Sequence, residues 1–300
     1  MSGSQTYRAY GLTVQAECPL PELEQGEGEP DVIVRFGRVP QTIEHATTRM
    51  VRFEAAPGRF LFRVDGIACY YVQEGREIVV EPYENSNGKD VRLFLLEPVF
   101  AALLYQRKNL VLHGAAVALN GNGIVLSGIS GYGKSTLAAK FYQKGYAILT
   151  DDVCPVTALK DTPRITPGFP ALRLWKDALK KLGCNVDNMA RARDNLDKYT
   201  LHVGDRFQRE PLPLAGIYIL VVQNNADISI TRLEGIGKMT TLMNIAYHLG
   251  FLQEEGGKTN HFEQCTAIAN TVGIYRLSQP RDRFCAEQLV SLIEEELSGR

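Results

Sequence analysis

The chemistry that this sequence can support begins with the stretch GISGYGKST at residues 128–136. It fits the pattern GxxxxGK[ST], in which glycines let successive backbone N–H groups turn inward around phosphate oxygens. The N-terminus of a following helix adds partial positive charge, the lysine reaches the β- and γ-phosphates, and the next hydroxyl ligates Mg²⁺. We therefore expect this loop to bind ATP with Mg²⁺. The expected binding residues are Gly128, Ser130, Gly131, Tyr132, Gly133, Lys134, Ser135 and Thr136.

Two adjacent carboxylates, Asp151 and Asp152, end the first strand predicted after this loop. In a parallel sheet, the carboxyl ends of the strands line the crevice in which ligands bind. Because only one helix and one strand separate the acids from the loop, we expect both to face the same phosphate. One of them can hold Mg²⁺ together with Ser135, while the other accepts a proton from an attacking hydroxyl. The alternative is an acid pair that caps a turn before Pro155.

Two basic side chains add to this candidate chemistry. His113 is the polar residue in the apolar run LVLHGAAVAL, on the strand joined by a tight hairpin to the strand that leads into the loop. A lone histidine on a strand is more often a core residue than a catalyst, so both interpretations stay open. Lys134 is expected at an exposed junction between the loop and its helix.

The elements that position these residues divide the chain into two predicted domains. The N-terminal part is rich in Val, Ile, Phe and Tyr in short runs separated by turn residues, which is typical of strands. Strands are predicted there at 7–17, 31–36, 59–65 and 77–82. The polar stretch 82–90 is predicted as a linker. We therefore predict a β-rich domain at 1–88, followed by a second domain at 89–300.

The second domain alternates strands and helices, which is typical of an α/β core. The elements expected around the loop are a helix at 91–109, strands at 110–119 and 123–128, a helix at 135–145 and a strand at 146–152. The elements expected further along are strands at 216–222, 228–233 and 274–277 and helices at 238–250, 262–272 and 285–297.

The composition of the chain counts against several classes of function. A formal net charge of −1 over 300 residues argues against a protein that binds nucleic acid by neutralising many phosphates. No stretch approaches the ~20 apolar residues of a membrane span. The start, MSGSQTYRAYG, lacks the pattern of a signal peptide, and the six scattered cysteines include no CxxC pair. We expect a cytoplasmic protein with no nucleic-acid or membrane partner.

The segment from 113 to 152 resembles the HPr kinase/phosphorylase family, whose fold is related to that of phosphoenolpyruvate carboxykinase. The shared features are His–Gly, GxSGxGKS and Asp–Asp, in this order and at closely similar intervals. The whole chain is similar to HPr-kinase-related serine kinases of about this length, through LLYQRKNLVLHGAAV, DDVCPV and PLPLAGIYIL. The resemblance implies an α/β P-loop core of the HPr-kinase/PEP-carboxykinase type. It also implies Asp152 as the general base, Asp151 as its metal- or substrate-side partner, and His113 as an active-site residue.

The resemblance further implies a serine kinase and its partners. Some of these related kinases phosphorylate a lasso-peptide precursor, so the implied acceptor is a peptide or protein serine, such as the C-terminal serine of such a precursor. HPr kinases are hexamers, which implies a homo-oligomer. The family's glutamate before Ile-Arg-Gly has no counterpart in the comparable stretch Phe169-Pro-Ala-Leu-Arg-Leu-Trp175. This departure counts against HPr itself as the acceptor and against a reverse, phosphate-dependent reaction.

One cationic role remains to be assigned, since the negative charge of a phosphoryl transition state must be opposed by Arg or Lys. The segment 197–214 is predicted as a polar loop leading to a strand, and it offers Lys198, His202 and Arg206. Lys198 is our first choice because the related kinases keep a lysine at this place. Arg173 is the alternative.

Three functions remain open on the sequence alone. The leading one is an ATP-dependent kinase of a peptide or protein serine. A kinase of HPr or of a small hydroxyl metabolite would use the same loop and acids. A regulatory ATPase is the third, although such proteins usually carry their carboxylate on a strand more distant from the loop.

Overall fold

The protein is described here from a computed structural model that covers residues 4–157, 162–187, 189–194, 196–224, 227–247 and 257–299. It is a mixed α/β structure, as the sequence predicts, with a nine-stranded sheet, an eight-stranded sheet and a two-stranded sheet in these residues. No helix in the described ranges is long and apolar enough to cross a membrane.

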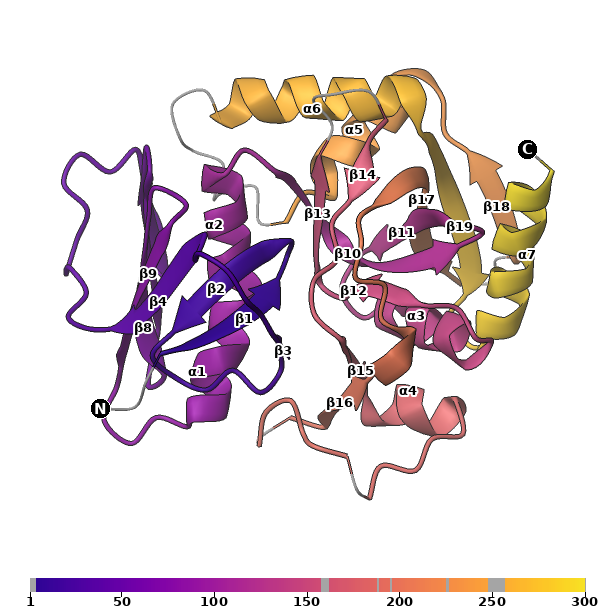
Figure 1. The fold of residues 1–300 in the computed structure, drawn as a ribbon. Coiled ribbons are helices and arrows are strands. Elements are labelled where there is room, and N and C mark those ends of the chain that lie inside the picture. Colours follow the sequence, from indigo (N-terminus) through magenta and orange to yellow (C-terminus); the bar gives the residue numbers. More distant parts are fainter. Residues whose placement is uncertain are drawn as a thin grey trace.

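The nine-stranded sheet is built from the N-terminal region, drawn in indigo and purple in Figure 1. Its strand order is β3-β1-β2-β4-β9-β8-β7-β6-β5. The strands are β1 (Gln5–Ala9), β2 (Leu12–Ala16), β3 (Glu24–Gln25), β4 (Val32–Phe36), β5 (Thr48–Arg49), β6 (Phe53–Ala56), β7 (Arg59–Val64), β8 (Ala68–Gln73) and β9 (Glu77–Pro82). The single strand predicted at 7–17 is instead a hairpin, because the chain turns at Tyr10 and Gly11, where φ is 53° and 71°.

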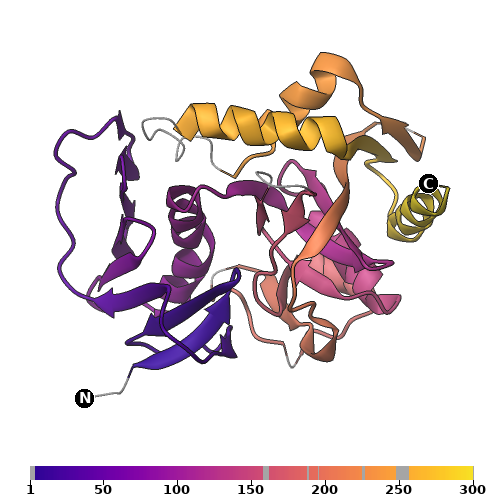
Figure 2. The same ribbon diagram turned by 45° about the horizontal axis from the view of Figure 1, so that its top comes forward.

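A continuous helical stretch lies between this sheet and the rest of the molecule (Figures 1 and 2). It consists of α1 (Gly88–Phe94), the π-helical turn η1 (Leu95–Val99) and α2 (Phe100–Gln106). The linker predicted at 82–90 is shorter than expected, because α1 already begins at Gly88. The Asn87 side chain caps this helix by accepting from the backbone N–H of Lys89. Pro98 lacks an N–H for the helical ladder and lies inside the π-helical turn.

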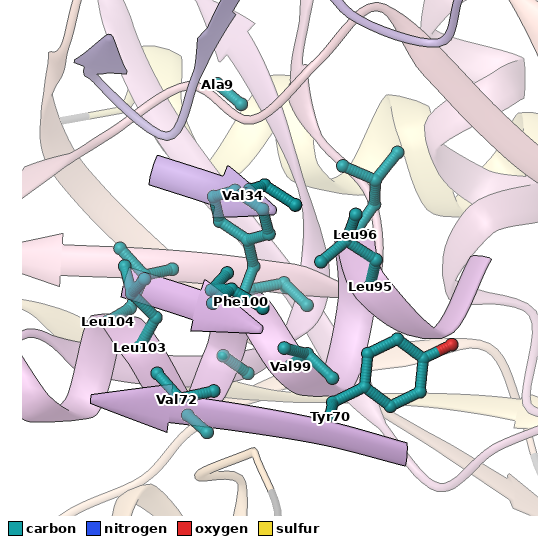
Figure 3. Packing of buried hydrophobic residues seen from close by; sticks show 14 of the residues in the cluster. Ala9, Val34, Tyr70, Val72, Leu95, Leu96, Val99, Phe100, Leu103 and Leu104 are labelled. Atoms are coloured by element: carbon teal, nitrogen blue, oxygen red, sulfur yellow. The ribbon is translucent and has the colours of Figure 1, made fainter. Parts of the chain in front are cut away.

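The apolar face of this helical stretch fills the core beneath the N-terminal sheet. Figure 3 shows Leu95, Val99 and Phe100 beside Tyr70 and Val72 of the sheet. The same cluster of buried residues also includes Val111, Val153, Phe169, Ala171 and Tyr247 from later in the chain. The helix thus packs on both the N-terminal sheet and the region of the acid pair. The domain boundary at 88 and 89 stays a prediction.

The eight-stranded sheet forms the second half of the molecule, in the order β11-β10-β13-β14-β17-β19-β18, with β12 paired to β10. Its strands are β10 (Leu110–Leu119), β11 (Asn122–Gly128), β12 (Ile148–Thr150), β13 (Val153–Thr157), β14 (Arg164–Ile165), β17 (Leu212–Gln223), β18 (Ser229–Arg232) and β19 (Gly273–Pro280). Because β11 also pairs with β17, the strands from β11 to β17 close on themselves. Within this sheet, β17 runs parallel to both β11 and β19, and the other pairings are antiparallel.

Helices cover both faces of this sheet. Alternate side chains of β10 point to opposite sides, so they pack against different helices. Ala115, Val117 and Leu119 belong to a cluster with α3 (Lys134–Gln143) and α7 (Ala286–Ser298). Leu112 and Ala116 belong to another cluster, with α5 (Gly235–Asn244) and α6 (Gly257–Thr271), the helix that crosses the top of Figure 1.

Two remaining features lie close to the candidate site. The two-stranded antiparallel sheet is formed by β15 (Ala171–Trp175) and β16 (Lys198–His202), with α4 (Lys176–Lys181) in the connection between them and the 3₁₀ turn η2 (Gly204–Arg206) after β16. The helix predicted at 238–250 corresponds to α5, which ends at Asn244. Residues 248–250 of the prediction lie outside the described ranges. After α5 the chain runs along β10, where Leu112 and Ala246 form a β-bridge.

Candidate active site

The phosphate-binding candidate at residues 128–136 has the predicted strand–loop–helix arrangement, from β11 into α3. Gly128 has a φ of 136°, and a Cβ built on it would lie 2.6 Å from the carbonyl oxygen of Leu220 on β17. Gly133 begins α3 as its N-cap with a φ of 97°, in the left-handed region that favours glycine. The loop is therefore closely packed against the sheet at its start and turns sharply into the helix at its end.

Lys134 lies inside the loop, where its side-chain amine donates a hydrogen bond to the carbonyl oxygen of Gly128 at 2.9 Å. The residue is only 8% exposed, so the expectation of an exposed junction is wrong. Burial lowers the pKa of this amine, while the nearby charges of Asp152 and Asp151 raise it. The amine is thus held where the loop surrounds a potential anion, and the acid pair opposes the effect of burial on its pKa.

Asp151 connects the loop to the two-stranded sheet of β15 and β16. The Ser135 hydroxyl donates to its Oδ1 at 2.8 Å, and the backbone N–H of Arg173 donates to its Oδ2 at 2.8 Å. Burial raises the pKa of this carboxyl, and the hydrogen bond from the Arg173 N–H opposes that rise. Both carboxylate oxygens therefore already have partners inside the protein.

Ser135 and Asp151 together provide two hard oxygen ligands of the kind that Mg²⁺ takes. No group of three or more His, Cys, Asp or Glu side chains in the described part of the chain could hold a metal by itself. Mg²⁺ bound with a nucleotide needs only one or two carboxylates, since phosphates and waters complete its octahedron. The residues present at this position therefore fit a nucleotide-bound Mg²⁺.

Asp152 adopts a backbone conformation that is uncommon for a residue with a side chain, with a φ of 69°. Its Oδ2 accepts a hydrogen bond from the Tyr247 hydroxyl at 3.1 Å, and its Oδ1 lies 3.4 Å from His113 Nδ1. The rings of His113 and Tyr247 meet edge to face, with 5.6 Å between their centroids. Burial raises the pKa of Tyr247 well above its usual value, and Asp152 adds to the rise, so the tyrosine stays a hydrogen-bond donor.

The acids lie near the loop, although the strand that precedes them does not pair in parallel with its neighbour. The sequence had led us to expect a parallel sheet here. β12 is antiparallel to β10, and β10 is antiparallel to β11. Two reversals restore the direction, so β12 and β11 point the same way and their carboxyl ends meet at one edge of the sheet. The predicted proximity of the acids and the loop is therefore found, through a different strand arrangement.

A cavity of about 540 Å³ adjoins this edge. Of the residues singled out in the sequence, those lining it are His113, Ser130, Gly131, Tyr132, Gly133, Lys134, Ser135, Thr136, Asp152, Arg173 and Lys198. Gly128 and Asp151 do not line it, but each accepts a hydrogen bond from a lining residue. Gly128 accepts from Lys134, and Asp151 accepts from Ser135. The volume lies in the range of small-molecule and cofactor sites.

The rest of the cavity lining combines positive charge with aromatic rings. Lys181, Arg281 and Arg283 line it together with Trp175 and Phe284. The Lys181 amine lies 6.0 Å from the centre of the Phe284 ring. Trp175 is 50% exposed and Phe284 40% exposed, so both rings offer open surface for a flat ligand group. Such a lining suits a ligand that has several negative charges and an aromatic part.

The two candidate cations of the sequence have different surroundings. The predicted loop at 197–214 is wrong at its start, because Lys198 begins β16, which pairs with β15, and it lines the cavity. Arg173 also lines the cavity, but its guanidinium pairs with Glu97 of η1 and lies 5.6 Å from the centre of the Phe169 ring. Lys198 is therefore the better placed of the two to contact a ligand.

The other two candidates of that segment do not line this cavity. Arg206 instead donates a hydrogen bond to the carbonyl oxygen of Tyr142 and stacks on its ring. His202 is exposed at the end of β16.

Two residues of this region were not singled out by the sequence. Tyr247 is nearly a hundred positions from Asp152 in sequence, and the pattern around it indicated an ordinary amphipathic helix. Glu97 precedes a proline within an apolar run, and nothing in its local sequence indicated a contact with Arg173. Only the packed structure brings these residues to the acid pair.

Comparisons with known proteins give short and distant likenesses. No family model matches the chain. The HPr kinase/phosphorylases of two Clostridium botulinum strains, Eklund 17B / Type B and Alaska E43 / Type E3, are each 36% identical to it over 67 residues. This match covers 21% of the chain and 22% of each relative, so the chain spans about a fifth of the length of the curated relatives it matches. The solved HPr(Ser) kinase/phosphatase of Coxiella burnetii is 10% identical, with a TM-score of 0.35, over 63% of this chain and 91% of that one.

Proposed function

We propose that this protein is an ATP-dependent kinase that transfers a phosphoryl group to a serine hydroxyl of a peptide or protein. The observation that carries the proposal is the arrangement of Lys134, Ser135 and Asp152 around one cavity, with Asp151 hydrogen-bonded to Ser135 behind it. An ammonium group, two oxygen ligands for Mg²⁺ and a separate carboxylate are the parts that phosphoryl transfer to an alcohol requires. The matches to HPr kinase/phosphorylases support the same class of reaction.

In the proposed reaction, the loop and α3 bind the phosphates through backbone N–H groups, and Lys134 moves its hydrogen bonds from loop carbonyls to phosphate oxygens. Ser135 and Asp151 would hold Mg²⁺, which would supply positive charge to neutralise the phosphates of the nucleotide. Asp152 accepts the proton of the serine hydroxyl as its oxygen bonds to the γ-phosphorus. The bond from that phosphorus to the bridging oxygen breaks, and ADP leaves. Lys198 opposes the charge on the transferred group.

His113 and Tyr247 orient the base in this proposal. Each contacts a different oxygen of Asp152, so the carboxylate cannot rotate freely. A fixed carboxylate orientation favours proton transfer, because a general base must lie within hydrogen-bond reach of the hydroxyl that it deprotonates.

We further propose that the acceptor is a serine in a peptide. The resemblance to related serine kinases suggests the C-terminal serine of a lasso-peptide precursor as one candidate. HPr and a small hydroxyl metabolite are the competing acceptors. The test incubates the protein and Mg-ATP with serine peptides, with the same peptides carrying alanine, and with HPr and free serine. Mass spectrometry then follows the addition of one phosphoryl group. Transfer that depends on the serine supports the kinase. ATP hydrolysis that no acceptor accelerates, with no phosphorylated product, would favour a regulatory ATPase.

A further inference from the structure

A second cavity, also of about 540 Å³, adjoins the one that holds the candidate phosphate loop. The two cavities share His113, Ser130, Tyr132 and Leu220 as lining residues. The remainder of the second cavity is built from the start of the loop, the end of β17 and the segment Thr241–Tyr247, which includes the end of α5. Two ligands, one in each cavity, would therefore meet at the loop and His113.

The chemical character of the two cavities differs. The first carries Lys134, Lys181, Lys198, Arg173, Arg281 and Arg283. Among the residues described as lining the second, none is Lys, Arg, Asp or Glu, and its wall is formed largely by Ile129, Ile219, Leu220, Val221 and Ile245. The polar side chains at its α5 end are Thr241 and Asn244. A polyanion suits the first cavity, whereas a neutral ligand with apolar groups suits the second.

The second cavity also leads to the candidate base. His113 and Tyr247 both line it, and both contact the carboxylate of Asp152. Tyr247 is held in place by its backbone, because its N–H donates to the carbonyl oxygen of Val111 at 2.8 Å and its carbonyl oxygen accepts from Tyr105. The Thr241–Tyr247 segment is therefore tied both to β10 and, through Asp152, to the edge where the acids lie.

We propose that the second cavity binds the phosphate acceptor, and that this acceptor is a serine flanked by neutral, apolar residues in a peptide. This assignment rests on the proposed kinase function and adds to it the place and the chemistry of the acceptor. The apolar neighbour of the serine packs against the aliphatic wall, and the serine hydroxyl extends past His113 to Asp152 at the junction of the two cavities. A charged neighbour loses its hydration in this cavity without gaining an opposite charge from the described wall.

The first test is a panel of peptides that differ only in the residue beside the serine, which is Leu, Gly, Lys or Glu. Burying a leucine side chain here raises kcat/KM for the Leu peptide about 10- to 150-fold over that for the Gly peptide. The Lys and Glu peptides fall at or below the Gly peptide. Equal kcat/KM values across the panel, or a preference for either charged peptide, would overturn the acceptor assignment.

A peptide that ends in serine extends the panel, as the free acid and as the carboxamide. A terminal carboxylate that stays in solvent leaves the two forms equal, whereas one that enters the neutral cavity makes the carboxamide the better substrate. A clear preference for the free carboxylate would contradict that binding mode and favour a cationic acceptor site.

The second test fills the cavity from its exposed rim. Asn244→Trp enlarges a lining residue that is exposed, so the core is not disturbed. Its matched control is Thr240→Trp, at an exposed position of the same helix that does not line the cavity. We expect Asn244→Trp to raise KM for the Leu peptide tenfold or more while leaving the Kd for a non-hydrolysable ATP analogue unchanged. The control should change neither value.

A charge change gives a gain-of-specificity version of the same test. Thr241→Glu places an acid in the wall of the cavity, so the Lys peptide should overtake the Glu peptide by tenfold or more. An unchanged order of the two peptides in this variant contradicts the assignment, as does an Asn244→Trp variant that loses ATP-analogue binding instead of peptide affinity. These results leave the kinase function intact. If the wild-type protein phosphorylates HPr but no peptide of the panel, the acceptor assignment alone fails. If it phosphorylates neither, the proposed function fails and the acceptor site fails with it.

Discussion

Replacing Asp152 by Asn is the most direct test of the proposed chemistry, because it removes the base and changes little else. Asn accepts the left-handed conformation almost as readily as Asp, so a φ of 69° adds no new strain. Its amide oxygen can still accept from the Tyr247 hydroxyl. We expect the free energy of unfolding to change by no more than about 1 kcal/mol, the net value of one hydrogen bond.

The catalytic effect of Asp152→Asn should be much larger than this change in stability. A general base contributes about 10²–10⁴ in rate, which corresponds to about 2.7–5.4 kcal/mol of activation free energy. Phosphotransfer to a serine peptide should therefore fall by that factor in kcat, while a fluorescent ATP analogue binds with unchanged Kd. Both values are measured on protein whose Tm matches that of the wild type.

The matched control is Asp152→Ala, which removes the carboxylate and also places a poorly tolerated residue at a positive φ. The left-handed conformation costs an ordinary residue about 1–2 kcal/mol, so this variant should lose both rate and stability. If Asp152→Asn keeps a rate within a few-fold of wild type, the base is another group and the mechanism proposed above is wrong.

Four further predictions concern binding, stability and assembly. Lys134→Ala should weaken ATP-analogue binding about 10- to 150-fold in a fluorescence titration, because it deletes a charged hydrogen-bond donor to phosphate; unchanged affinity would contradict its role. Burial raises the pKa of Asp151 above its unfolded value, so the metal-free protein should lose stability as pH rises from the unfolded to the folded pKa. Asp151→Asn should remove this part of the pH dependence of Tm, and an unaltered Tm profile would contradict the argument. Glu97→Gln should lower stability by about 3–5 kcal/mol in denaturant titrations, because it leaves the Arg173 charge buried, and adding Arg173→Met should recover much of that loss. Light scattering should give at least twice the mass of one chain, since we predict a homo-oligomer.

The sequence predicted the parts of the site that local pattern determines. The glycines and lysine of residues 128–136 follow from the geometry of phosphate binding, and the strand–turn–strand unit before them follows from LVLHGAAVAL and its neighbouring turn residues. Asp151 and Asp152 could be placed near the loop because so little chain separates them from it. Short-range constraints of this kind are visible in a single sequence.

The contacts that the sequence did not predict are those made between distant segments. Lys198 was placed in a loop because its segment is polar, yet pairing with β15 makes it the start of a strand. Strand formation there depends on a partner more than twenty residues earlier in the chain, so local propensity carries little information about it. Glu97 shows the same limitation, since its ion pair with Arg173 depends on how the helical stretch packs against the two-stranded sheet of β15 and β16.

The backbone conformation of Asp152 explains how two adjacent acids can take different roles. In a regular strand, successive side chains point to opposite faces, so neighbouring carboxylates do not meet the same ligand. Here β12 ends at Thr150, and the left-handed turn at Asp152 redirects its side chain to His113 and Tyr247. Asp151 points instead to the Ser135 hydroxyl, and the N–H of Arg173 fills its other oxygen. Of the two acids, only Asp152 lines the first cavity, so it is the one that an acceptor hydroxyl can reach. The uncommon conformation at Asp152 is thus the local feature that separates the proposed metal-binding carboxylate from the proposed base.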